Sequence, residues 1–134
     1  MDIEQLDNDL SQLALMKNRL SQLEYDNEEY DRLEEELHGL EDEFQEKHGE
    51  YLDDALSLIH DEFCADNDVL LPIAYLAKSY KIEDGNYDVE MDQGVMVDVD
   101  DYPGKSTRLV LIPSPTRIVL IVDENTREEV WKAG

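Results

Sequence analysis

The sequence TRLVLIPSPTRIVLIV, residues 107–122, contains two nearly continuous apolar runs with a proline-rich turn between them. The runs are residues 109–112 and 118–122, and the turn is Pro113-Ser114-Pro115. Short apolar runs bounded by turn residues are typical of strands that are covered on both faces. We therefore expect the two runs to pair as the central hairpin of a β-sheet. Its predicted core residues are Leu109, Val110, Leu111, Ile118, Val119, Leu120 and Ile121.

Further strands are expected around this hairpin. Turn-forming residues recur through the second half of the chain and separate short stretches rich in β-branched residues. The predicted strands are residues 73–82, 87–91, 95–99, 107–112, 116–122 and 126–131. Pro72 indicates that the strand after it lies at an edge or starts irregularly, and a helical turn over residues 74–80 is the alternative. The pattern predicts a small antiparallel β-meander.

The first half of the chain carries apolar residues spaced three or four apart, with acidic and amide side chains around them. A stripe this narrow is typical of a coiled-coil seam, which needs a partner helix. We expect the seam to hold the protein together as a homo-oligomer. The predicted self-association residues are Leu6, Leu10, Leu13, Leu20, Leu23, Tyr30 and Leu37.

Three positions bear on the number of helices in this half. Asn27 lies at a seam position, where a polar residue either fixes the register of a coiled coil or marks a solvated gap. His38-Gly39 and His48-Gly49 both place a histidine before a glycine, as helix ends prefer, and the second is the better stop. One unbroken helix over residues 2–63 is the alternative, because a glycine inside a helix costs only about 1 kcal/mol.

These patterns together predict an α+β protein. Its N-terminal part is a long helix or a helical hairpin of coiled-coil type, and a small antiparallel β-meander domain follows. The expected divisions are an acidic helical segment over residues 1–49, a connecting helix over 50–66 and a β-rich domain over 67–134. The wide apolar face of residues 50–64 indicates that the connecting helix packs on the sheet.

The chain is strongly acidic, with 35 Asp and Glu residues, 11 Lys and Arg residues and a net charge of −24. Such a charge repels phosphate backbones and anionic lipid surfaces, so we expect no direct binding to nucleic acid or to a membrane. The densest acidic run is either a solvated face that favours solubility or a surface that attracts a basic partner. Its candidate partner-binding residues are Glu28, Glu29, Glu34, Glu35, Glu41 and Asp42.

The sequence offers little for catalysis or for binding a cofactor. His60 and Cys64 have the spacing of two metal ligands on a helix, but motifs that would supply further ligands are missing. We interpret the pair as a buried thiol beside a partly exposed histidine. The acidic turn that begins at Asp98 lacks the glycine and the closing glutamate of an EF-hand loop. We expect no catalytic residue, no cofactor and no metal site, and we predict that the protein is not an enzyme.

The start of the chain and its cysteine content bear on localisation. Asp2, Ile3 and Glu4 follow Met1, which is unlike the basic and then apolar start of an export signal. No stretch of the sequence has the apolar length of a membrane span. Cys64 is the single cysteine, so an internal disulfide is impossible. We therefore expect the protein to be cytoplasmic.

The sequence therefore predicts a non-enzymatic protein–protein interaction module: an adaptor, a scaffold or a small acidic chaperone. Its partner is a protein, basic in character if the acidic run recruits it. One alternative is an acidic nucleic-acid mimic that inhibits a DNA- or RNA-binding protein. In outline, a coiled-coil finger on a β domain is similar to the transcript-cleavage factors that enter RNA polymerase, so a finger-like polymerase regulator is a further alternative.

Overall fold

The structure, a computed structural model, describes residues 2–134 and has the predicted α+β architecture. Within these residues the helices α1 (Ile3–Ser21) and α2 (Glu28–Phe63) come first, followed by the short 3-10 helix η1 (Pro72–Tyr75) and six strands. The strands are β1 (Lys81–Glu83), β2 (Asn86–Asp88), β3 (Val95–Val97), β4 (Thr107–Ile112), β5 (Arg117–Ile121) and β6 (Arg127–Lys132). None of the helices in this described part is long and apolar enough to cross a membrane.

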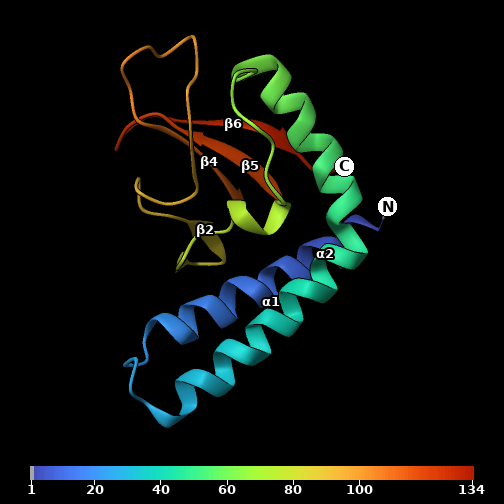
Figure 1. The fold of residues 1–134 in the computed structure, drawn as a ribbon, viewed down its shortest axis with the longest axis vertical. Helices are drawn as coiled ribbons and strands as arrows, with labels where there is room; N and C mark the ends of the chain where they lie inside the picture. The colour runs from blue at the N-terminus through green and yellow to red at the C-terminus, as the bar shows by residue number, and fades with distance from the viewer. Residues whose placement is uncertain (1) are drawn as a thin grey trace.

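The helical half is a hairpin whose turn is formed by residues 22–27 (Figure 1). Asn27 caps the start of α2, because its side-chain oxygen accepts a 2.8 Å hydrogen bond from the backbone N–H of Glu29. The prediction of Asn27 as a seam residue is therefore wrong. A single unbroken helix over residues 2–63 is also wrong, since the chain reverses direction before Asn27.

The expected helix ends at Gly39 and Gly49 are wrong as well, because α2 runs through both glycines. Phe44 and Leu52, on either side of Gly49, are both buried in the main core. Most of the stability of a helix in a protein comes from packing of its apolar face. Here that packing outweighs the roughly 1 kcal/mol that each glycine costs a helix interior.

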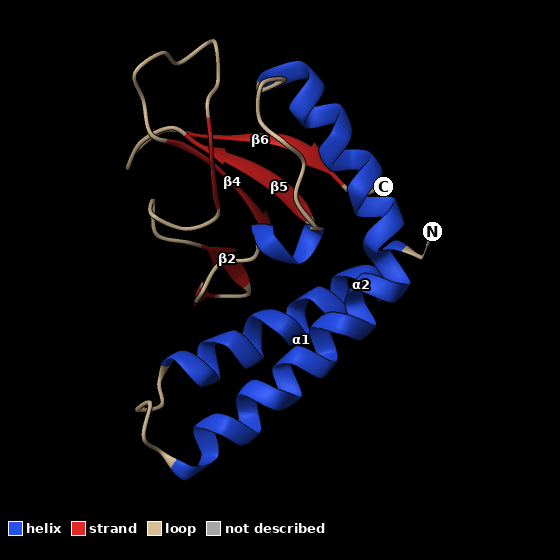
Figure 2. Ribbon diagram, in the orientation of Figure 1, coloured by secondary structure: helices blue, strands red, loops and turns tan. Residues whose placement is uncertain are grey.

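The second half of α2 covers the sheet, as the sequence predicts for residues 50–64. Figure 2 shows α2 continuing past the N-terminal end of α1 and running beside the strands. Leu52, Leu56 and Ile59 are buried there, in the same cluster as the core residues of β4 and β5. The connection is thus the end of one long helix, and the prediction of a separate helix after Gly49 is wrong.

The main sheet is an antiparallel meander in the order β3-β4-β5-β6. The predicted central hairpin is confirmed: β4 pairs with β5 in the register Leu109↔Leu120 and Leu111↔Ile118. Side chains alternate between the two faces of the sheet and are buried on both. The face toward α2 carries Leu109, Leu111, Ile118 and Leu120, and the other face carries Val110, Ile112, Val119 and Ile121.

Residues 72–88 differ from the predicted strands. Residues 72–75 form η1 instead of the start of a strand, with Pro72 at its first position, where the fixed φ of proline suits a helical turn. Strands β1 and β2 form a separate hairpin around Asp84-Gly85, and both turn residues have positive φ. Positive φ at both central residues is typical of the tight turns that join two antiparallel strands.

The second face of the sheet is covered by a smaller core that joins both halves of the chain. Ala14 of α1 packs there with Ala77, Tyr80 and Val89. Asn18 of α1 fixes this contact, because its side-chain amide exchanges two hydrogen bonds with the backbone of Tyr80, at 2.6 and 2.9 Å. The helical hairpin is therefore anchored to the sheet instead of projecting freely from it.

Candidate protein-binding surfaces

The predicted self-association seam lies mostly inside the chain. Leu6, Leu10, Leu13 and Leu37 are at most 4% exposed, because α1 and α2 cover each other and pack on the sheet. Leu20, Leu23 and Tyr30, nearer the turn, are half-buried. The partner helix that the seam requires is thus supplied by the same chain. Self-association stays a prediction, but the buried leucines could serve it only if the hairpin opened.

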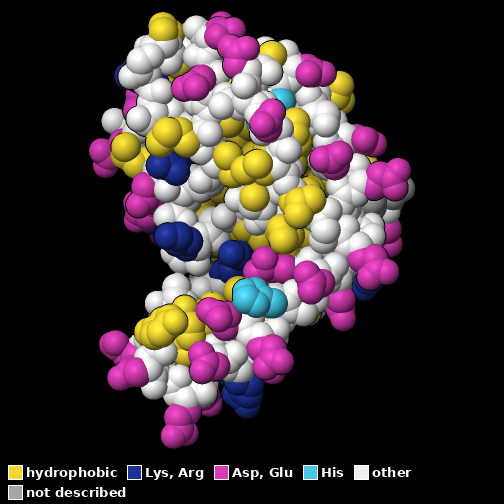
Figure 3. All heavy atoms as spheres, in the orientation of Figure 1, with side chains coloured by type: hydrophobic (Ala, Val, Ile, Leu, Met, Phe, Trp, Pro, Cys, Tyr) yellow, Lys and Arg dark blue, Asp and Glu magenta, His cyan; other side chains and the backbone are white. Residues whose placement is uncertain are grey.

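The six predicted acidic residues all lie on the first half of α2. Glu28, Glu29, Glu35 and Asp42 are exposed, whereas Glu34 and Glu41 are half-buried. Glu28 and Glu29 also have a local structural role, since acidic side chains in the first turn stabilise the positive end of a helix. Acidic side chains are not confined to this helix, because Figure 3 shows them on both parts of the molecule, around a central area of hydrophobic side chains in the upper part.

A groove between the two helices is lined on α1 by Gln12 and Met16, which lie opposite the sheet-facing Ala14 on that helix. It consists of two hollows of about 260 and 100 Å³, which share Gln12 and Leu40 in their walls. We call it the outer groove. The larger hollow is lined by Gln12, Leu15, Met16, Arg19 and Leu40, and the smaller by Asp9, Gln12, Leu13, Leu40, Glu43, Phe44 and Lys47. Leu15 is 52% exposed, and Met16 and Leu40 are half-buried, so the groove presents apolar side chains to solvent.

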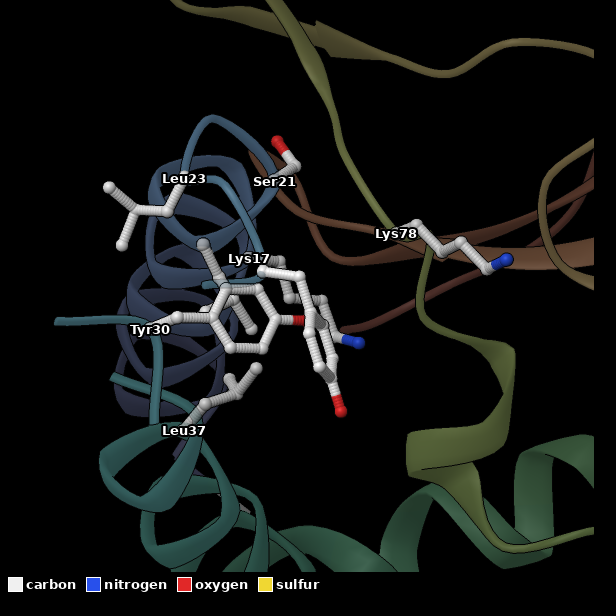
Figure 4. Close-up of a pocket in the computed structure, with 8 residues that line it drawn as sticks. Lys17, Ser21, Leu23, Tyr30, Leu37 and Lys78 are labelled. Atoms are coloured by element: carbon white, nitrogen blue, oxygen red, sulfur yellow. The ribbon is translucent and has the colours of Figure 1, made fainter. Parts of the chain in front are cut away.

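A third hollow, of about 370 Å³, lies at the turn of the hairpin; we call it the tip cleft. The rings of Tyr25 and Tyr30 lie 5.1 Å apart in it, and Tyr25 is 83% exposed. Figure 4 shows Tyr30 and Leu37 on one side of the cleft, with the side chain of Lys78 directed away from them. Its walls are formed by Lys17, Leu20, Ser21, Leu23, Tyr25, Tyr30, Leu37 and Lys78.

The buried polar side chains lie between the elements. His48 of α2 is 4% exposed and bonds through Nε2 to the carboxylate of Asp9 on α1, at 2.7 Å. His60 bonds through Nε2 to the hydroxyl of Tyr75, at 2.9 Å, and through Nδ1 to the carbonyl of Asn67, at 3.0 Å. These bonds join α1 to α2 and α2 to the segment that follows it, which is a structural role.

The prediction for the His60 and Cys64 pair is correct for the thiol and wrong for the histidine. Cys64 is buried, and burial raises the pKa of its thiol. His60 is only 2% exposed, so the prediction of a partly exposed histidine is wrong. The cause is the fold of residues 64–75, which brings Tyr75 over the imidazole. Within residues 2–134, no three His, Cys, Asp or Glu side chains gather closely enough to hold a metal ion.

Leu15 and Arg19 are among the groove residues that the sequence analysis missed. Both fall outside the stripe of three- and four-residue spacings, so each looks like an ordinary surface position. The signal that could have found Leu15 is a large apolar residue directly between the buried Ala14 and the half-buried Met16. A leucine there gives nothing to the seam, yet it widens the apolar surface beside it.

Comparison with known proteins adds no family to this description. Neither the protein-family models nor the curated proteins nor the solved structures give a match to the chain.

Proposed function

We propose that the chain is a protein-binding module, an adaptor, scaffold or small acidic chaperone, and that its helical hairpin is the binding element. The observation that carries this proposal is apolar surface left open on both sides of one hairpin, in the outer groove and the tip cleft. Contiguous exposed apolar surface rimmed by polar residues is typical of interaction sites on soluble proteins.

Charge supports a basic partner. The first half of α2 carries the predicted acidic residues, and its only ion pair within the described residues is the one between Arg32 and Glu29, at 3.6 Å. Carboxylates that are not paired within the chain are free to attract a basic surface. Attraction of this kind raises the association rate and weakens as salt screens the charges.

The test compares two variants that change the net charge equally. A partner isolated by affinity capture from the native host is purified and its binding measured at low and high salt. The hairpin variant replaces Glu34, Glu35, Glu41 and Asp42 with lysine. The control variant replaces four exposed acids of the sheet half with lysine, namely Asp100, Asp101, Glu128 and Glu129.

We expect the hairpin variant to lose most of the association rate at low salt and the control variant to lose much less. One exposed ion pair is worth only about 0–1 kcal/mol, so four reversals together are needed for a clear effect. Circular dichroism verifies that both variants fold. If the two variants bind equally well, the acidic run of α2 is not what recruits the partner, and the proposal fails.

A further inference from the structure

The shape of the outer groove indicates what could occupy it. The groove follows two antiparallel helices, from Asp9 to Arg19 on α1 and from Leu40 to Lys47 on α2. Ten residues of α1 correspond to about 15 Å along the helix axis. A third helix of about three turns has this length, and a groove between two helices is a common seat for the apolar face of an amphipathic helix.

The apolar contacts would come from the larger hollow. Leu15, Met16 and Leu40 line the larger hollow with no carboxylate among its lining residues. Leu15 is the most exposed of the three, at 52%. A helix laid in the groove would cover these side chains and complete a three-helix arrangement at this end of the molecule.

The charges around the groove indicate which charge the bound amphipathic helix would carry. Glu36 and Glu43 are exposed and lie four residues before and three residues after Leu40, so both flank it on the surface of α2. Arg19 lines the larger hollow, and Lys47 lines the smaller one beside Asp9. Asp9 and Glu43 both line the smaller hollow, so this part of the groove is the more acidic one. The net charge of −24 adds a long-range attraction for a basic partner.

We propose that the outer groove binds a basic amphipathic α-helix of the partner protein, about three turns long, with its apolar face on Leu15, Met16 and Leu40 and basic residues toward the end that lies over Asp9 and Glu43. This inference rests on the proposed function and specifies the chemistry of the partner. Docking removes the exposed part of Leu15 from water, so the leucine contributes to affinity although it contributes little to the fold.

The test uses a designed peptide of about 11 residues, or three helical turns, with leucines at helical spacing on one face and lysines on the other. A scrambled peptide of the same composition, without an apolar face, is the control for simple charge attraction. Binding is measured by fluorescence anisotropy to the wild type and to the Leu15→Gln, Gln12→Trp and Leu58→Gln variants. Leu58 is a matched control, because it is a 68% exposed leucine on a helix and does not line the outer groove.

We expect the scrambled peptide to bind at least tenfold more weakly than the amphipathic one. Leu15→Gln should weaken binding about fivefold to tenfold, the cost of leaving half a leucine side chain unburied. Gln12→Trp should weaken it further by filling the place where the two hollows meet, while Leu58→Gln should bind as the wild type does.

Three results would overturn the inference. One is equal binding of the two peptides, and another is equal loss in Leu15→Gln and Leu58→Gln. The third is a dimer of the protein alone that Leu15→Gln dissociates, since the groove would then be occupied by a second copy of this chain. None of them decides the proposed function, because the charge-reversal experiment depends on the captured partner and not on this peptide.

Discussion

Replacing Leu10 with alanine tests whether the hairpin is closed within one chain. Leu10 is fully buried against the chain's own core, so truncation to alanine removes about three methylene-sized groups from a packed site. At about 0.8 kcal/mol for each group, the transfer loss is about 2.4 kcal/mol, and the cavity left behind raises the expected cost to about 3–4 kcal/mol. Leu15→Ala in the same helix should cost at most about 1.2 kcal/mol, since half of that side chain is already exposed.

The assay is urea unfolding followed by circular dichroism at two protein concentrations twentyfold apart. A hairpin closed within one chain predicts unfolding midpoints that do not depend on concentration, for the wild type and for both variants. If Leu10→Ala costs no more than Leu15→Ala, Leu10 is not packed in a core. If the midpoints rise with protein concentration, another chain holds the helices together. The seam would then be intermolecular, as the spacing of its leucines alone suggests.

Three further outcomes are expected. Leu120→Ala should lower the free energy of unfolding by about 2–5 kcal/mol in urea denaturation, because Leu120 is fully buried, whereas a loss below about 0.5 kcal/mol would mean that the strand is exposed. Gly94→Ala should destabilise by at least about 2 kcal/mol in the same assay, because Gly94 has φ +91° and a Cβ would collide with the carbonyl of Leu109; Gly39→Ala, in open space on α2, should stabilise by about 0.5–1 kcal/mol. Burial raises the pKa of Tyr80 from 10.0, so its contribution to the free energy of unfolding should be constant below about pH 10 and fall as the pH rises further. Urea unfolding from pH 8 to 11.5 should therefore show a smaller loss of stability at alkaline pH in Tyr80→Phe than in the wild type.

The sequence was sufficient to predict the local fold where one signal dominates. The runs at 109–112 and 118–122 are apolar without interruption, and Pro113-Ser114-Pro115 marks the turn, so both the hairpin and its two-sided burial follow from the pattern. The apolar face of residues 50–64 likewise predicts a helix on the sheet. In each case the local preference and the tertiary packing favour the same structure.

The sequence was insufficient where local signals compete. Asn27 fits a seam position and a helix cap equally well, and Gly49 fits a helix end and a helix interior. The cap hydrogen bond to Glu29 decides the first case and tertiary burial of Phe44 and Leu52 the second, and spacing along the chain reports neither. The same holds for residues 72–75, where the proline favours a helical turn over the strand that the apolar pattern predicts.

Of the candidate surfaces, the sequence likewise predicts one and misses another. The acidic residues of α2 can be found by counting charges, because all of them lie on one continuous helix. The outer groove cannot, because its walls come from two helices whose pairing depends on a turn that the spacing did not locate. Contacts such as the hydrogen bond from Thr116 to Asp7, at 2.8 Å and 109 residues apart, fix how the hairpin lies on the sheet and leave no trace in local patterns.

The central claim is that the outer groove of the helical hairpin binds a basic amphipathic helix. The most direct measurement is a titration of the isotope-labelled protein with the basic amphipathic peptide, followed in amide nitrogen–proton correlation spectra. We expect the largest shift changes to fall within residues 9–19 and 40–47, with the sheet little affected. Changes concentrated on the edge strands β3 or β6, or no changes at a large molar excess of peptide, would contradict this claim.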